Sequence, residues 1–193
     1  MNRFYRTKLY LALLHYPVRN RDGSDIAAAV TSIDLHDIAR AARTYGAAGF
    51  YVITPLADQR EFAGKIVGHW VDGAGSRHNP DRGDALSLIR IREDLAGAVD
   101  EISSREKTGV RVVATSAAGA AGQMEFTELR HELEAGSHAY LLALGTAWGL
   151  SDEFMQNADC RLAPIAGASD YNHLSVRSAA AIILDRLMGG QTG

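Results

Sequence analysis

AYLLALGTAWGLSDEF, residues 139–154, contains the pattern that decides the fold. Residues 139–145 are almost continuously apolar, and a loop with two glycines follows them. Ser151 then precedes Asp152 and Glu153, an arrangement typical of a helix N-cap and an acidic first turn. An unbroken apolar run, rather than an alternating one, indicates a strand that is covered on both faces. The stretch therefore predicts a buried strand, a loop and a helix.

The same order of strand and helix recurs along the chain. This repetition predicts an α/β fold of three layers, built on a parallel-rich sheet of about six strands. No internal repeat or linker separates the segments, so we expect residues 1–193 to form a single domain. The further strands are expected at 9–14, 50–55, 86–91, 110–117 and 160–165, and the helices at 32–45, 58–71, 92–106, 125–134, 151–157 and 176–187.

The composition is that of a soluble globular protein, with 47% hydrophobic and 22% charged residues. A net charge of −3 provides no general positive field for nucleic acid, so any basic patch must be argued from position. The single cysteine, Cys160, excludes an intramolecular disulfide and a C-x-x-C zinc site. No apolar run approaches the ~20 residues of a membrane span, and the run 9–14 lacks a signal-peptide cleavage site. We therefore expect a cytoplasmic protein without a membrane partner.

Several familiar site motifs are missing. The sequence has no G-x-x-x-x-G-K-[ST], no G-x-G-x-x-G between a strand and a helix, and no G-x-S-x-G. Asp34, His36 and Asp37 are close in sequence, but such near neighbours on a helix do not share a face. We therefore expect no metal site. Ligands of parallel sheets bind beyond the carboxyl ends of the strands, and three segments there or nearby stand out.

The first segment is the loop GTAWGL, 145–150, at the end of an expected strand. Gly145 and Gly149 would let a ligand approach the backbone, whose N–H and C=O groups can read an adenine edge. The alternative is a tight turn with Trp148 packed in the core.

The second segment is PIAGASDYNHLSVRSAAAIILDRL, 164–187. Its apolar residues recur at helical spacing from Val176 to Leu187, which predicts a core-packed helix capped by Ser175. The loop before it is either a binding loop or a simple connection. The third segment is DLHDIARAARTYGA, 34–47, where Arg40 and Arg43 lie away from the apolar face and could also form a solvated basic surface.

Taken together, in this order and spacing, these three segments resemble motifs of the SPOUT superfamily of S-adenosylmethionine-dependent RNA methyltransferases. Residues 34–47 are similar to the first motif, N-x-G-x-x-x-R with a later glycine: Arg40 and Gly46 match, whereas Asp34 replaces the asparagine and His36 the glycine. Residues 141–154 are similar to the second motif, a strand followed by G-x-E-x-x-G-L. Their loop is one residue shorter and lacks the glutamate, and the matching residues are Gly145, Gly149 and Leu150.

The third motif, an I-P-M-x-G loop followed by S-L-N-V-S-V-A-x-A-I, resembles CRLAPIAG and HLSVRSAAAI. Ser175 takes the asparagine position and Arg177 the second serine. The resemblance covers about residues 34–187. More closely, the sequence resembles a compact bacterial SPOUT subfamily related to the C-terminal domain found beside tRNA (guanine-N1) methyltransferases. The segments that carry this closer resemblance are HYPVRNRDG, AVTSIDLHDIAR, HNPDR and DYNHLSVRSA. The remaining matches to the third motif are Pro164, Gly167, Leu174, Val176 and Ala179 to Ile182.

The resemblance implies a deep C-terminal trefoil knot, which physical rules for chain connections disfavour in general. It also implies a homodimer with RNA, tRNA or rRNA, crossing the interface, and a cofactor clasped by loops 144–150 and 162–178 that leaves as S-adenosylhomocysteine. No metal is required. The expected cofactor-binding residues are Leu144, Gly145, Thr146, Gly149, Leu150, Ile165, Gly167, Leu174, Ser175 and Ser178.

Arg40 is expected to orient or activate the methyl acceptor, with Ser175 and Asn172 lining the pocket. Two alternatives stay open. The missing motif-two glutamate and the weak global charge favour a non-catalytic, knotted RNA-binding or accessory module. An unrelated α/β enzyme for a nucleotide-like small molecule would use His15 or His173 as general base. The arginines expected to contact RNA phosphates are Arg19, Arg21, Arg43, Arg77 and Arg82.

Overall fold

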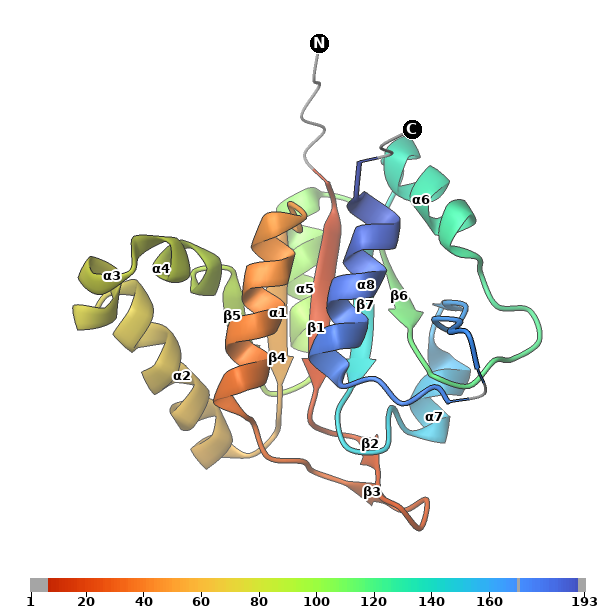
Figure 1. Cartoon of the computed structure of the whole chain (residues 1–193), viewed down its shortest axis with the longest axis horizontal. Coiled ribbons are helices and arrows are strands. Elements are labelled where there is room, and N and C mark those ends of the chain that lie inside the picture. Colours follow the sequence, from red (N-terminus) through yellow and green to blue (C-terminus); the bar gives the residue numbers. More distant parts are fainter. Residues whose placement is uncertain (1–6, 170, 191–193) are drawn as a thin grey trace.

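Six parallel strands form the central sheet of the computed structural model, which describes residues 7–169 and 171–190 (Figure 1). Their spatial order is β5-β4-β1-β7-β6-β8. The predicted parallel α/β sheet of about six strands is thereby confirmed. The strands are β1 (Leu9–Leu14), β4 (Gly49–Ile53), β5 (Ile89–Arg92), β6 (Val110–Ala114), β7 (Ala139–Gly145) and β8 (Cys160–Arg161).

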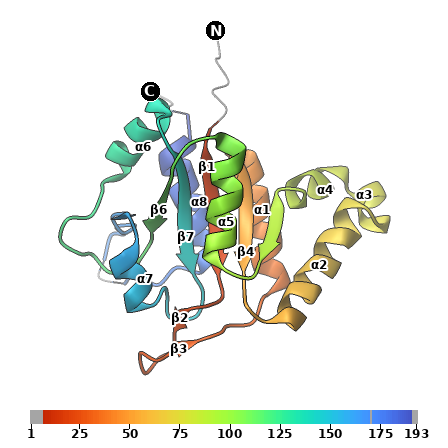
Figure 2. The same cartoon turned by 180° about the vertical axis from the view of Figure 1, so that it is seen from behind.

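Helices cover both faces of this sheet. On one face lie α1 (Ser32–Thr44), α6 (Phe126–Ala135) and α8 (Val176–Met188), and on the other lie α5 (Leu95–Glu106) and α7 (Asp152–Asn157) (Figure 2). Side chains of β1 alternate between the two resulting cores: Leu9, Leu11 and Leu13 pack with α1 and α8, whereas the residues between them pack with α5. Because both faces are covered, the strands are apolar throughout rather than alternating.

The largest departure from the expected elements lies between β4 and β5. Here α2 (Ala57–Val71) is followed by two short helices, α3 (Ala74–His78) and α4 (Pro80–Leu86), where a loop was expected. The expectation that a strand begins at Leu86 is also wrong, because this residue ends α4. Asn79 caps α4 by accepting a hydrogen bond from the Arg82 N–H at 3.0 Å, and Pro80 occupies the first turn. The Asn-Pro pair thus starts a helix, a use of proline that sequence alone does not separate from a turn.

Two shorter corrections concern the ends of the sheet. The strand expected at 160–165 has only two paired residues, Cys160 and Arg161, and the strand expected at 110–117 ends at Ala114. The polar stretch after β1 contains a small antiparallel ribbon of β2 (Val18–Arg19) and β3 (Asp25–Ile26).

The strand order contains a switch point beside β1. The chain builds β4 and β5 outward on one side of β1, and β7 then enters on the other side, between β1 and β6. Adjacent connections leave the sheet in opposite directions at such a point, which leaves room for a ligand beyond the carboxyl ends of the strands. Within residues 7–169 and 171–190, no helix has the length and apolar character needed to cross a membrane.

Candidate active site

A pocket of about 840 Å³ opens beyond the carboxyl ends of β1, β6 and β7. Its walls come from four segments: the approach to α1 with its first turn, the residues after β6, the β7–α7 loop, and the stretch from Ala163 into α8. The volume is in the range of pockets that hold cofactors and other small ligands. The site therefore lies at the switch point of the sheet, where the loop 145–150 and the segment before α8 meet Asp34, the first residue of the third segment singled out in the sequence.

The β7–α7 loop is a fixed wall of this pocket. The Thr146 N–H and hydroxyl both donate to the Leu14 carbonyl, at 3.2 and 3.0 Å. The Arg19 N–H donates to the Gly149 carbonyl at 2.9 Å, and the Trp148 N–H donates to the Arg19 carbonyl at 3.1 Å. The loop is thus tied by its backbone to β1 and to β2.

Glycines permit the tight path of this loop. A Cβ atom on Gly145 would stand 2.4 Å from the Leu150 nitrogen and 2.6 Å from the Gly149 carbonyl carbon, closer than real Cβ contacts. Gly149 has φ +100°, a backbone conformation that residues with a side chain rarely adopt. Ala147 has φ +51° although it carries a Cβ, which costs about 1–2 kcal/mol. The two motif glycines are therefore required by geometry.

Trp148 does not pack in the core, and that sequence alternative is wrong. It is 61% exposed, although it belongs to the pocket lining. The left-handed residue before it and the hydrogen bonds on either side hold the backbone in this outward position.

The segment before α8 forms a second wall. The Asn172 side-chain amide donates to the Ala117 carbonyl at 2.9 Å, which ties this segment to the loop after β6. Ser175 caps α8: its hydroxyl accepts a hydrogen bond from the Ser178 N–H at 3.3 Å. Asn172 and Ser175 both line the pocket, and so do Ile165 and Leu174. Of the ten expected cofactor residues, Gly167 and Ser178 are not among the lining residues.

A charged pair joins the first turns of α1 and α8 in the pocket wall. Asp34 is only 8% exposed, and the hydroxyl of the N-cap Thr31 donates to its carboxylate at 2.5 Å. Arg177 reaches the same carboxylate at 3.4 Å and the Asp37 carboxylate at 3.5 Å. Sequence reasoning missed Arg177 as a site residue. The only signal was its place at a motif position where the family has a serine.

His15 lies beneath this wall, at the end of β1. Its side chain is fully buried, and neither ring nitrogen has a hydrogen-bond partner in the described part of the chain. Burial lowers the pKa of His15 to about 4, because a charged imidazole would lose its hydration, and the nearby Asp34 carboxylate only partly opposes this. His15 is therefore neutral at physiological pH. It is not part of the pocket lining. The exposed His173, the other histidine considered as a general base, does line the pocket.

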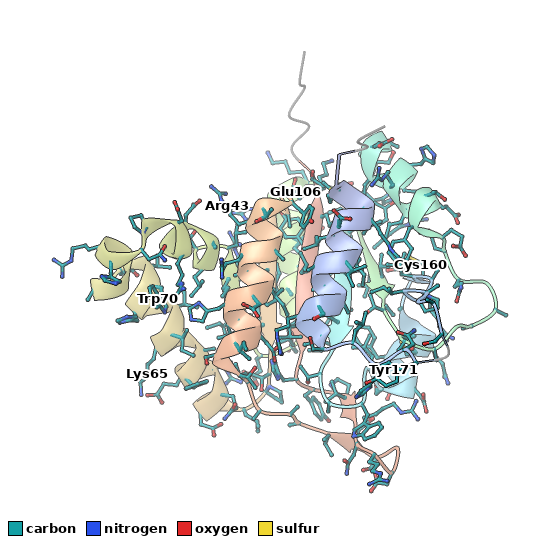
Figure 3. The ribbon with its side chains drawn as sticks, viewed as in Figure 1. Arg43, Lys65, Trp70, Glu106, Cys160 and Tyr171 are labelled. Atoms are coloured by element: carbon teal, nitrogen blue, oxygen red, sulfur yellow. The ribbon has the colours of Figure 1, made fainter. Side chains whose placement is uncertain are left out.

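The predicted arginines are spread over two regions. Arg19 lines the pocket and pairs with Asp152 at 2.9 Å, and Arg21 is exposed on the same β2–β3 ribbon. Arg43 pairs with Asp84 at 2.7 Å, and the guanidinium of Arg82 lies over the Trp70 ring at 4.5 Å. Figure 3 shows Arg43 and Trp70 on the α1–α4 side, away from Tyr171 beside the pocket segment.

Arg40 and Arg77 are exposed, on α1 and α3 respectively, and neither lines the pocket. The structure of one chain thus brings together the two expected cofactor loops with Ser175 and Asn172, but it does not bring Arg40 to them.

The lining suits an amphipathic cofactor of nucleoside type. Apolar side chains of Leu144, Leu150 and Ile165 offer a surface for a flat base, and the hydroxyls of Thr146 and Ser175 lie in the same lining. The lining also holds both signs of charge, from arginines and from Asp34. No group of three or more His, Cys, Asp or Glu side chains that could hold a metal ion occurs in residues 7–169 and 171–190.

Comparisons with known proteins agree with this geometry. The model of a family described as SAM-dependent RNA methyltransferase matches residues 8–189. A tRNA (guanine-N(1)-)-methyltransferase of Oleidesulfovibrio alaskensis is 44% identical over 181 residues, which are 94% of this chain and 42% of that protein. The chain therefore spans less than half of this relative.

Solved structures share the fold. A putative methylase family protein from Neisseria gonorrhoeae has a TM-score of 0.65 at 18% identity, covering 98% of this chain and 85% of its own. The SpoU methyltransferase AviRb from Streptomyces viridochromogenes, in complex with the cofactor AdoMet, has a TM-score of 0.56 at 21% identity. That match covers 95% of this chain and 57% of AviRb. At these identities the likeness establishes the fold.

Proposed function

This chain belongs to the family of SAM-dependent RNA methyltransferases, and from that premise we propose that it transfers the methyl group of S-adenosylmethionine to a nucleotide of tRNA. The observation that carries the proposal is the 840 Å³ pocket at the switch point, walled by the two loops that match the family's cofactor motifs. The guanine-N1 specificity named for the relative describes a protein more than twice as long as the matched part, so we leave the acceptor atom open.

The bound cofactor supplies a methyl group on a sulfonium, a leaving group that needs no further activation. The protein's own part is alignment, from which well-oriented reactants can gain roughly 7–11 kcal/mol. Backbone groups of residues 144–150, fixed to β1 and β2, would hold one side of the cofactor, and residues 165–169 and 171–175 would hold the other. Ser175 and Asn172 line the pocket, and the buried Asp34 keeps the Arg177 guanidinium in its wall.

Arg40 has a role in this proposal only if a second copy of the chain is present. It lies outside the pocket of its own chain, so we propose a homodimer in which Arg40 of one subunit reaches the acceptor in the pocket of the other. The RNA would cross that interface. Arg19 and Arg21 near the pocket, and Arg43, Arg77 and Arg82 on the α1–α4 side, would contact phosphates, and binding would weaken steeply with salt.

Mixed dimers test the shared site. An Arg40→Ala subunit keeps an intact pocket, and a Gly145→Val subunit keeps Arg40 but has a blocked loop. If the site is shared, each parent is inactive and the mixture regains methylation of total tRNA with labelled cofactor. A mixture as inactive as its parents, with heterodimers verified by tag purification, contradicts the role of Arg40.

We also propose that the segment entering α8 passes through the loop between β6 and α6, as a trefoil knot requires. Two contacts support this path: Asn172 bonds to Ala117, and Met124 bridges to Leu162, so the two segments lie against each other. We propose in addition that the protein acts in the cytoplasm, where it would encounter its tRNA substrate.

The unrelated nucleotide-binding enzyme considered from sequence is excluded by the family match. The accessory RNA-binding module differs from our proposal in one measurable property, affinity for the cofactor. Calorimetric titration with S-adenosylmethionine decides between them: binding with labelled methyl transfer to tRNA supports the enzyme, and no binding at millimolar cofactor supports the accessory module.

A further inference from the structure

Trp148 presents an unusual combination of exposure and fixed position. It is 61% exposed, and it is the only tryptophan, tyrosine or phenylalanine in the pocket lining within the part of the chain that the structure describes. Exposed aromatic residues on mobile loops need no explanation, but this loop is tied down. The Trp148 N–H donates to the Arg19 carbonyl, and the next residue accepts from the Arg19 N–H.

The backbone next to Trp148 is held in a conformation that local preferences oppose. Ala147 has φ +51°, and Gly149 has φ +100°. Strained residues of this kind persist where the surroundings enforce them, and they gather at binding and active sites. The observed loop maintains an open aromatic surface at the entrance of the cofactor pocket.

The proposed reaction creates a need for such a surface. A base atom inside an RNA helix cannot reach a methyl donor at the bottom of a pocket, so the target nucleotide must leave its stack. Unstacking is unfavourable unless the base finds a new aromatic partner, and stacking of this kind tolerates any base because each one has a π face. Arg19, on the strand that holds the loop, lies in the same lining, where its guanidinium pairs with Asp152.

We propose that Trp148 is a stacking surface for the unstacked target nucleobase, and so a positioning residue for the methyl acceptor. The inference rests on the proposed function and deepens it, because it names the recognised state of the substrate: a single nucleotide drawn out of the RNA stack. Cofactor binding is assigned to other groups of the pocket and does not depend on the indole.

The first test compares variants of one residue. Trp148→Ala is expected to raise the KM for total tRNA roughly 5- to 150-fold, the range that loss of one base–aromatic contact produces. Trp148→Phe should recover most of the affinity, and Trp148→Leu, which keeps apolar volume without a π face, should not. The Kd for S-adenosylmethionine should stay at the wild-type value. Phe62→Ala, at a 43% exposed aromatic on α2, is the matched control and should change nothing.

The second test reads binding without methyl transfer. The chain has two tryptophans, so Trp70→Phe leaves Trp148 as the only indole fluorophore. A short RNA single strand of mixed sequence should quench it. Quenching without methylation by the wild type would overturn the proposed function and leave the stacking surface standing. Methylation with equal KM for wild type and Trp148→Ala would overturn the stacking surface alone. Conversion of Trp148→Ala to a monomer, measured by light scattering, would also overturn it, because the indole would then be a subunit contact.

Discussion

Substitution of three pocket-loop glycines by alanine should produce three different effects, although the sequence motifs treat them alike. On Gly145 a Cβ would fall 2.4 Å from the Leu150 nitrogen, short of an ordinary contact by roughly 1 Å, and the obstacle is backbone that cannot rotate away. Overpacking of this kind costs about 1–3 kcal/mol. In a chain of this length, that lowers Tm by roughly 2–12 °C.

The other two glycines serve as comparisons for the loss of stability expected at Gly145. Gly149 has nothing within 4 Å of an added Cβ, so its φ of +100° is the only penalty, and we expect a loss of about 1–2 kcal/mol. Gly167 has an unremarkable φ and a nearest atom at 3.9 Å, so its change should lie within about 0.5 kcal/mol of wild type. The order of destabilisation should be Gly145→Ala, then Gly149→Ala, with Gly167→Ala last.

Thermal melts and cofactor titration measure the two consequences. Moving the 145–150 wall by about 1 Å should also slow methyl transfer, since misplacement on that scale costs about 100-fold in rate. Gly167→Ala should keep both cofactor affinity and rate. If Gly145→Ala melts and binds S-adenosylmethionine like Gly167→Ala, the loop is not the rigid wall described above.

Three further outcomes follow from the site. S-adenosylmethionine at 100 times its Kd should stabilise the protein by about 2.7 kcal/mol and raise Tm by roughly 5–11 °C, with adenosine as the weaker comparator in the same melts. Folding lowers the pKa of His15 from 6.5 to about 4. Between pH 6.5 and pH 4 the imidazole is therefore protonated in the unfolded chain but neutral in the folded one. Stability should therefore fall by roughly 3 kcal/mol as pH drops from 6.5 to 4, and urea melts of His15→Gln should lack this slope. Asp34→Asn and Arg177→Ser should show a coupling of about 0.2–1 kcal/mol in a double-mutant cycle, small because Arg177 is partly exposed, and a cycle without coupling would mean that the pair is incidental.

Much of the fold could be predicted because its signals are local. The unbroken apolar run 139–145 predicts a strand covered on both faces, and the structure has that strand. Ser151 and Ser175 cap the helices that follow them, as their residue types predict. The helices at Ala74–His78 and Pro80–Leu86 were missed since an Asn-Pro pair serves both turns and helix starts. In that case only packing against α1 and α2 decides the outcome.

The site was less predictable because its side chains are arranged by distant contacts. Asp34 and Arg177 are separated by 143 positions, and no periodicity links them. The exposure of Trp148 depends on the left-handed Ala147 and on hydrogen bonds to β2, none of which a local pattern reveals. The placement of Arg40 outside its own pocket depends on which face of α1 the sheet covers.

Residues that fix the backbone of the pocket and residues that act through an exposed side chain should respond differently to mutation. Gly145 acts through the path of the backbone, so its replacement should lower thermal stability and cofactor affinity together. Trp148 and Arg40 are exposed side chains whose removal leaves the core untouched, so they should alter RNA affinity or transfer while Tm stays constant. Asp34 is intermediate, because its carboxylate both accepts a hydrogen bond from Thr31, the N-cap of α1, and holds Arg177 in the wall. Plotting the change in Tm against the change in RNA KM or in transfer rate for these variants therefore separates residues that build the pocket from residues that use it.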